Sequence, residues 1–114
     1  MTFTTEQFEE LVRTAIDDVP EPFASALAEV PVIVRERSRP ETGSAYGLYT
    51  GVPLDQRGGG MPFLPSTIEI YRHPLVDHFP DPEVLRAEVR ITVLHELGHH
   101  LGMDEDQLER LGYA

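Results

Sequence analysis

Two histidines four residues apart, His95 and His99, lie near the C-terminal end of the chain, and Glu96 directly follows the first of them. On a helix, residues i and i+4 lie on the same face, so both imidazole rings can reach one metal ion. Glu96 flanks this pair, where its carboxylate can take a proton from a metal-activated water. The segment 95–99, HELGH, therefore predicts a metal site with a general base beside it.

A third metal ligand must come from close by in the sequence. Catalytic zinc usually has three protein ligands and one open position, and a chain without cysteine offers only histidine and carboxylate side chains as strong ligands. Gly102 is expected to end the helix in a left-handed conformation, so a side chain a few residues later can turn back towards His99. We take Glu105 as the third ligand. Three neighbouring acids are alternatives: Asp104, Asp106 and Glu109.

The helix that carries this motif has clear boundary signals. Asp81 is a predicted N-cap, and Pro82 is suited to the first helical position. From there to Leu101 the apolar residues are too many for a narrow stripe, which predicts a largely buried helix. Gly98 lowers helix propensity, so we expect it to permit close packing near the site. Residues 104–111, DEDQLERL, predict a short C-terminal helix.

The remainder of the chain predicts a small scaffold around that helix. An amphipathic helix is expected from an N-cap at Thr5 to about Asp18, followed by one or two apolar helical turns within 23–28. Strands are expected at 32–34, within 46–51 and at 66–71, separated by a loop at 53–65 that contains Gly58 to Gly60. Residues 72–80 read as a connector with a helical turn.

The segment Ser66–Tyr71 alternates polar and apolar side chains and is the best strand signal in the chain. If this strand lies at the edge of the sheet beside the metal-bearing helix, an extended peptide could add to it as another strand. The last four residues of this segment are then the predicted substrate-binding residues: Ile68, Glu69, Ile70 and Tyr71.

Length and composition limit the class of protein. With 114 residues the chain is expected to form a single domain, residues 1–114. The formal net charge of −11 repels phosphate backbones and anionic lipids, which argues against nucleic acid and membrane partners. A charged start followed by an apolar run is absent, and so is a stretch long enough to span a bilayer, so a cytoplasmic location is expected. Oligomeric state is left open.

The extended motif HELGHHLGMDE, with IEIYRHPL before it and DQLERLGY after it, resembles the small zincin-like metallopeptidases called minimal zincins. The resemblance implies an α+β fold, in which a small mixed sheet packs against an N-terminal helix and a buried active-site helix. It further implies one zinc ion, peptide or unfolded protein as substrate, and hydrolysis with Glu96 as general base. Members commonly have aspartate where this chain has Glu105.

Other interpretations remain open at this stage. The metzincin pattern needs a third histidine, and a ribonuclease pattern HxxxHxxxxxH needs one at position 105, where this chain has glutamate. A catalytically weak or inactive metal-binding module on the same scaffold is the main alternative function. His100 points away from its neighbours on a helix and is expected to be packed or to support a ligand. Four residues are candidates for stabilising an oxyanion: Tyr71, His73, His78 and Tyr113.

Overall fold

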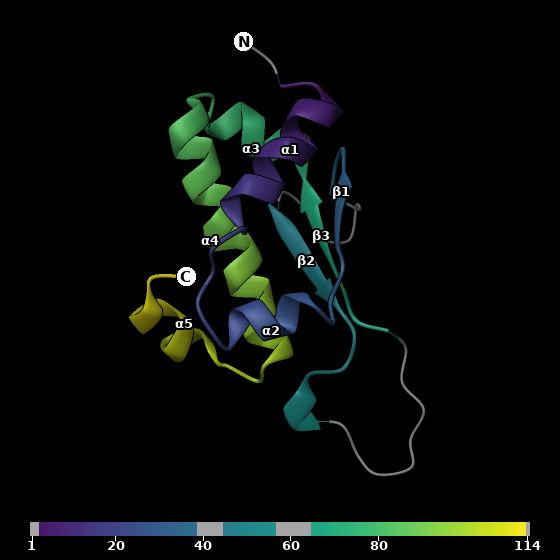
Figure 1. The fold of residues 1–114 in the computed structure, drawn as a ribbon, viewed down its shortest axis with the longest axis vertical. Coiled ribbons are helices and arrows are strands. Elements are labelled where there is room, and N and C mark those ends of the chain that lie inside the picture. The colour runs from purple at the N-terminus through teal and green to yellow at the C-terminus, as the bar shows by residue number, and fades with distance from the viewer. Residues whose placement is uncertain (1–2, 39–44, 57–64, 114) are drawn as a thin grey trace.

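The computed structural model describes residues 3–38, 45–56 and 65–113. Its helices and strands follow one another along the chain in the order shown by colour in Figure 1. Their bounds are α1 Thr5–Ala15, α2 Phe23–Leu27, β1 Val32–Arg35, β2 Gly47–Thr50, the 3₁₀ turn Leu54–Gln56, β3 Thr67–Tyr71, α3 Arg72–His78, α4 Pro82–His100 and α5 Glu105–Leu111.

The three strands form one mixed sheet in the order β1-β3-β2. β1 pairs with β3 in parallel, with Val32 opposite Ile68, and β2 pairs with β3 antiparallel, with Tyr49 opposite Ile68. The strand β3 is therefore central, and its expected place at the edge of the sheet is wrong. Alternation correctly predicted a strand here, but it carries no information on how many neighbouring strands that strand has.

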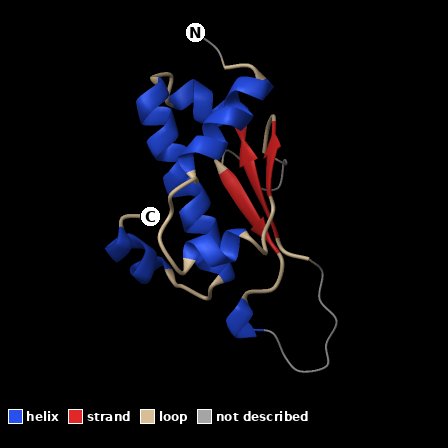
Figure 2. Ribbon diagram, in the orientation of Figure 1, coloured by secondary structure: helices blue, strands red, loops and turns tan. Residues whose placement is uncertain are grey.

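The helix α4 is the centre of the core. Figures 1 and 2 show the helices gathered to one side of the sheet, with α4 running alongside it. This helix packs against β2, β3, α1, α2 and α3. The helix is less enclosed than predicted, because its first two turns are mostly exposed and Val84 is 47% exposed. Its buried residues all lie from Leu85 onward: Leu85, Val89, Val93, Leu94, Leu97, Gly98 and His100.

The helix boundaries follow local hydrogen bonding. α4 begins as predicted, with Asp81 accepting from the backbone of Glu83 and Pro82 in the first turn. The N-cap of α1 is Thr4, one residue before the predicted cap, because Thr4 and Gln7 form a reciprocal capping box. α1 also ends at Ala15, earlier than expected, and residues 72–78 form the complete helix α3 in place of a connector.

Helices and a small mixed sheet together confirm the predicted α+β class, including the short C-terminal helix α5. The glycine-rich part of the predicted loop, Gly58 to Gly60, lies outside the described residues. Within the described ranges, no helix is both long enough and apolar enough to cross a membrane.

Candidate metal centre

The last two turns of α4 bring three potential metal-binding side chains together. Ligand atoms of His95, Glu96 and His99 all lie within 4.8 Å of one another. The two imidazole rings have their centroids 4.8 Å apart, as expected for neighbours at i and i+4 on one helical face. The predicted motif is therefore assembled by local helix geometry alone.

Glu105 reaches back to both histidines from the first turn of α5. Its Oε1 atom lies 2.9 Å from Nε2 of His99 and 3.4 Å from Nε2 of His95. Among the alternatives, Asp104 is the N-cap of α5 and accepts a hydrogen bond from the backbone of Gln107 at 2.8 Å. The structure thus brings Glu105 to the two imidazoles, while the carboxylate of Asp104 is engaged in capping.

Two glycines allow this return of the chain. Gly102 has a φ of +83°, the left-handed conformation predicted for the end of α4. Gly98 faces Leu108 of α5 so closely that an added Cβ would stand 2.3 Å from the Cδ2 atom of that leucine. Leu108 is itself fully buried. Gly98 therefore permits the close packing that was expected of it, and this packing holds α5 and Glu105 against α4.

The ring of His95 is oriented by the end of the chain. Its Nδ1–H donates a hydrogen bond of 2.7 Å to the backbone carbonyl of Tyr113, which assigns the proton to Nδ1. The other nitrogen, Nε2, is then available on the side of Glu105. Histidine ligands in metal sites are commonly fixed by such a bond from their second ring nitrogen. Two histidine nitrogens and one carboxylate form the donor set of a catalytic zinc, so these residues fit the ion.

Glu96 lies in a setting suited to a general base. Its side chain is only 13% exposed, and this burial raises the pKa of the carboxyl above its ordinary value. The nearby imidazoles of His99 and His95, and a hydrogen bond from the backbone N–H of Tyr49, act in the opposite direction on that pKa. A carboxyl whose pKa is raised towards neutrality accepts and releases a proton more readily near pH 7.

Tyr49 of β2 contacts the candidate metal centre, a relation that the sequence did not reveal. Besides its backbone contact to Glu96, its hydroxyl hydrogen-bonds with Nδ1 of His100 at 2.8 Å and with Oγ of Ser66 at 2.9 Å. His100 is 1% exposed, in agreement with its expected packed position. These contacts join β2 to the last turn of α4. They span up to 51 residues of sequence, so no local pattern could signal them.

The four residues considered for oxyanion stabilisation are engaged elsewhere. The hydroxyl of Tyr71 donates to Glu69 at 3.0 Å, and the side chain of His73 contacts Arg72. Nδ1 of His78 bonds to the hydroxyl of Tyr46 at 2.6 Å. Tyr113 acts through its backbone carbonyl, as described above, while its ring packs edge-on against Phe23 at 5.4 Å.

The predicted substrate-binding strand requires correction. Ile68, Ile70 and Tyr71 have no exposed surface, Glu69 is 3% exposed, and β3 is paired with another strand on both of its edges. Its backbone groups therefore cannot pair with an incoming peptide. The strand at the edge of the described sheet that packs against α4 is β2.

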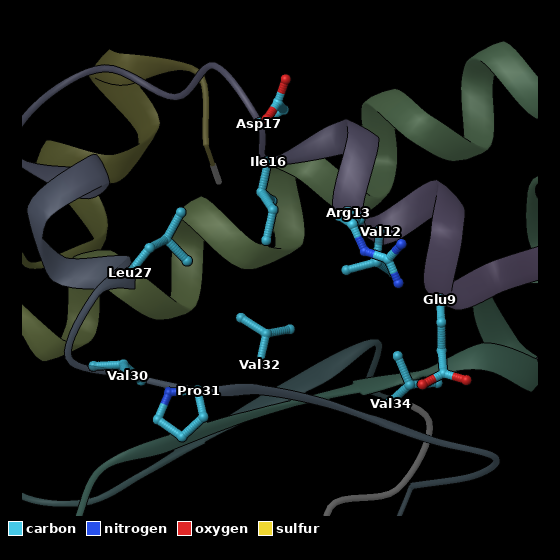
Figure 3. A pocket seen from close by; sticks show the side chains of 10 residues that line it. All are labelled: Glu9, Val12, Arg13, Ile16, Asp17, Leu27, Val30, Pro31, Val32 and Val34. Carbon is cyan, nitrogen blue, oxygen red and sulfur yellow. The ribbon is translucent and has the colours of Figure 1, made fainter. Parts of the chain in front are cut away.

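Three of the hollows in the surface of the described residues differ in their relation to the site. One of about 480 Å³ lies between α1, α2 and β1, is lined mainly by aliphatic residues such as Ile16, Leu27 and Val32 (Figure 3), and has no residue of the metal-binding motif in its lining. A second, about 320 Å³, includes His95 and Glu96 in its lining. A third, about 380 Å³, includes His99. Two hollows thus adjoin the candidate metal centre.

Comparison with known proteins agrees with this geometry. No curated protein matches the chain at a significant level. The family profile described as zincin-like metallopeptidase matches residues 24–113, which include the sheet, the helix α4 and α5. This match covers far more than half of the sequence. The chain therefore belongs to the zincin-like metallopeptidase family.

Proposed function

We propose that this protein is a zinc-dependent metallopeptidase that hydrolyses peptide bonds in peptides or unfolded proteins. The observation that carries the proposal is the meeting of His95, His99 and Glu105 at one point, with Glu96 buried beside them. Family membership supports the same class of chemistry. One zinc ion, held by these two histidines and Glu105, is the proposed cofactor.

A bound zinc would supply Lewis acidity, which polarises a peptide carbonyl and lowers the pKa of an attacking water. The protein residues supply binding and proton transfer. The Nδ1–H of His95 is held by the Tyr113 carbonyl, which leaves Nε2 on the side of Glu105, where it would hold the ion. Glu96 takes the proton of the attacking water and passes it to the leaving amine, a role that its raised pKa supports.

The proposed peptide-binding element is the outer edge of β2. The backbone carbonyl of Tyr46 accepts a hydrogen bond from the N–H of Tyr71 in β3. The N–H of Tyr49, at the edge of β2 that faces away from β3, donates to the carboxylate of Glu96. Since backbone groups of alternate residues in an antiparallel strand face alternate edges, those of Gly47 and Tyr49 face away from β3. An extended peptide that pairs with this edge would lie directly beside Glu96.

A comparison of wild type with Glu96→Gln tests the proposal. Both proteins are incubated with zinc and a mixed peptide library, cleavage is followed by mass spectrometry, and zinc content is measured in parallel. We expect equal zinc binding, cleavage by wild type alone, and loss of that cleavage when a chelator removes the metal. Glu83→Gln, an exposed acid at the start of α4, is the matched control and should cleave like wild type.

Two outcomes would contradict this function. Zinc binding by both proteins without cleavage by either would favour the metal-binding module over the peptidase. Cleavage by Glu96→Gln at the rate of wild type would show that another group acts as the base.

A further inference from the structure

The hollow of about 320 Å³ beside the candidate metal centre lies between β2 and the middle of α4. His95 and Glu96 line it, and so does Glu88, which precedes His95 by seven residues. At a rise of 1.5 Å per residue, Glu88 stands about 10 Å from His95 along the helix axis. The pocket thus extends from the reacting groups along two turns of α4, which is a suitable length for one long side chain of a bound peptide.

The walls of this pocket are apolar and firmly held. Tyr46 forms one wall, and its hydroxyl is fixed by the 2.6 Å bond to His78 while its ring packs edge-on against Phe79. Ile91 of α4 lines the pocket as well. At Gly47 an added Cβ would stand 2.9 Å from Cγ2 of Thr92, another lining residue. The β2 side and the α4 side of the pocket are therefore closer together than a residue with a Cβ at position 47 would permit.

Glu88 supplies a second carboxylate to the pocket, two turns of α4 before Glu96. Its side chain is half-buried, and its carboxylate has no ion pair or hydrogen bond with any residue of the described ranges. Arg86 and Arg90 each lie two residues from Glu88 and therefore on other faces of the helix, and Arg90 is occupied by Asp18 at 2.8 Å and by the carbonyl of Ala15. A carboxylate partly removed from water and without a partner favours a cation beside it.

We propose that this pocket selects an arginine or lysine side chain of the substrate and that Glu88 is the specificity-determining residue. The inference rests on the proposed peptidase function. Tyr46 and Ile91 pack against the aliphatic part of the side chain, and the cationic head group pairs with Glu88. The overall charge of −11 acts in the same direction, because it attracts basic peptides to the protein.

Matched peptides measure this preference in turnover. Peptides that differ only in arginine, citrulline or norleucine, placed in turn on either side of the cleaved bond, are compared by kcat/KM. We expect arginine to exceed the neutral isostere citrulline by about 10- to 100-fold at one position, the range for a hydrogen bond to a charged group. Glu88→Gln should abolish that ratio, and Glu83→Gln, with the same change in net charge, should retain it.

A binding measurement reads the pocket without catalysis. Chemical shifts of Ile91 and Thr92 are followed by NMR in zinc-free protein during titration with N-acetyl-arginine amide or N-acetyl-citrulline amide. We expect saturable shifts with the arginine compound alone, and their loss in Glu88→Gln. This result would support the pocket even if no peptide were cleaved, in which case only the peptidase proposal would fail.

Equal treatment of arginine and citrulline by wild type, in cleavage or in binding, would overturn the inference. So would an unchanged preference in Glu88→Gln, or an equal loss of preference in Glu83→Gln, since the latter would trace the effect to net charge. In each of these cases, cleavage that still depends on Glu96 would leave the peptidase function intact.

Discussion

Replacing Gly98 with alanine is expected to weaken zinc binding through the packing of α5, without touching a ligand. The added Cβ would stand 2.3 Å from Cδ2 of Leu108 and 3.2 and 3.3 Å from its Cγ and Cδ1. Leu108 is fully buried, so its side chain has no solvent-filled space to turn into. The helix α5 must therefore shift, and Glu105 in its first turn moves away from His95 and His99.

The size of the effect on stability follows from two opposing contributions. Alanine is favoured over glycine in a helix interior by roughly 1 kcal/mol, whereas overpacking of a core costs roughly 1 to 3 kcal/mol. The free energy of unfolding of zinc-free Gly98→Ala should therefore fall by about 0 to 2 kcal/mol. Zinc affinity should fall by at least about 10-fold, because even the loss of an outer support of a ligand costs 10- to 100-fold.

Urea unfolding and zinc competition against a chromophoric chelator measure both quantities. They are applied to wild type, Gly98→Ala, Leu108→Ala and the double variant. Once Leu108 is shortened, the clash is gone, so the change at position 98 should become stabilising by its helix propensity. If Gly98→Ala is more stable than wild type and binds zinc equally well, the close contact between α4 and α5 does not position Glu105, and the reasoning is refuted.

Two other predictions concern carboxylates. Glu105→Ala should reduce zinc affinity by more than the 10- to 100-fold that is typical when a residue supporting a metal ligand is removed. Glu109→Ala on the same helix should leave zinc affinity unchanged. Equal losses of affinity in chelator competition would contradict the assignment of Glu105 as a ligand. Glu36 accepts hydrogen bonds from Arg72 and Thr5, and these bonds lower the pKa of its carboxyl from the ordinary value of 4.5. The contribution of Glu36 to folding stability is therefore present above pH 4.5 and is lost as the pH falls through the lowered pKa. Thermal unfolding of chelator-treated Glu36→Gln and wild type should therefore differ at pH 7 and converge in acid; a constant difference would argue against this linkage.

The sequence predicted those features of the site that depend only on residues close together along the chain. The spacing of His95 and His99, the cap at Asp81 and the left-handed Gly102 are all properties of a few consecutive residues, and each appears in the structure as expected. The return of Glu105 follows from the same local logic, since it is six residues from His99.

The sequence could not predict contacts between distant segments. The central place of β3 depends on two partner strands, β1 and β2, which local alternation cannot order. His95 is held by the backbone carbonyl of Tyr113, and since every residue carries such a carbonyl, the residue type at position 113 could not signal this contact. The contacts of Tyr49 with Glu96 and His100 likewise exist only after β2 has paired with β3 and packed on α4. In each case the missing information is the order of elements in space.

The local origin of the metal centre has a consequence for how the protein opens. All three proposed ligands lie within residues 95–105, so bringing them together closes only a short loop and costs little chain entropy. The helix α5 contributes Leu108 as its only buried residue, whereas the core of α1, the sheet and α4 includes many. Local opening of α5 should therefore cost less free energy than opening of the core, so zinc should leave while α5 is transiently open and the scaffold around α4 stays closed. The protein would then gain and lose its metal through a hinge at one end, with no rearrangement of its core.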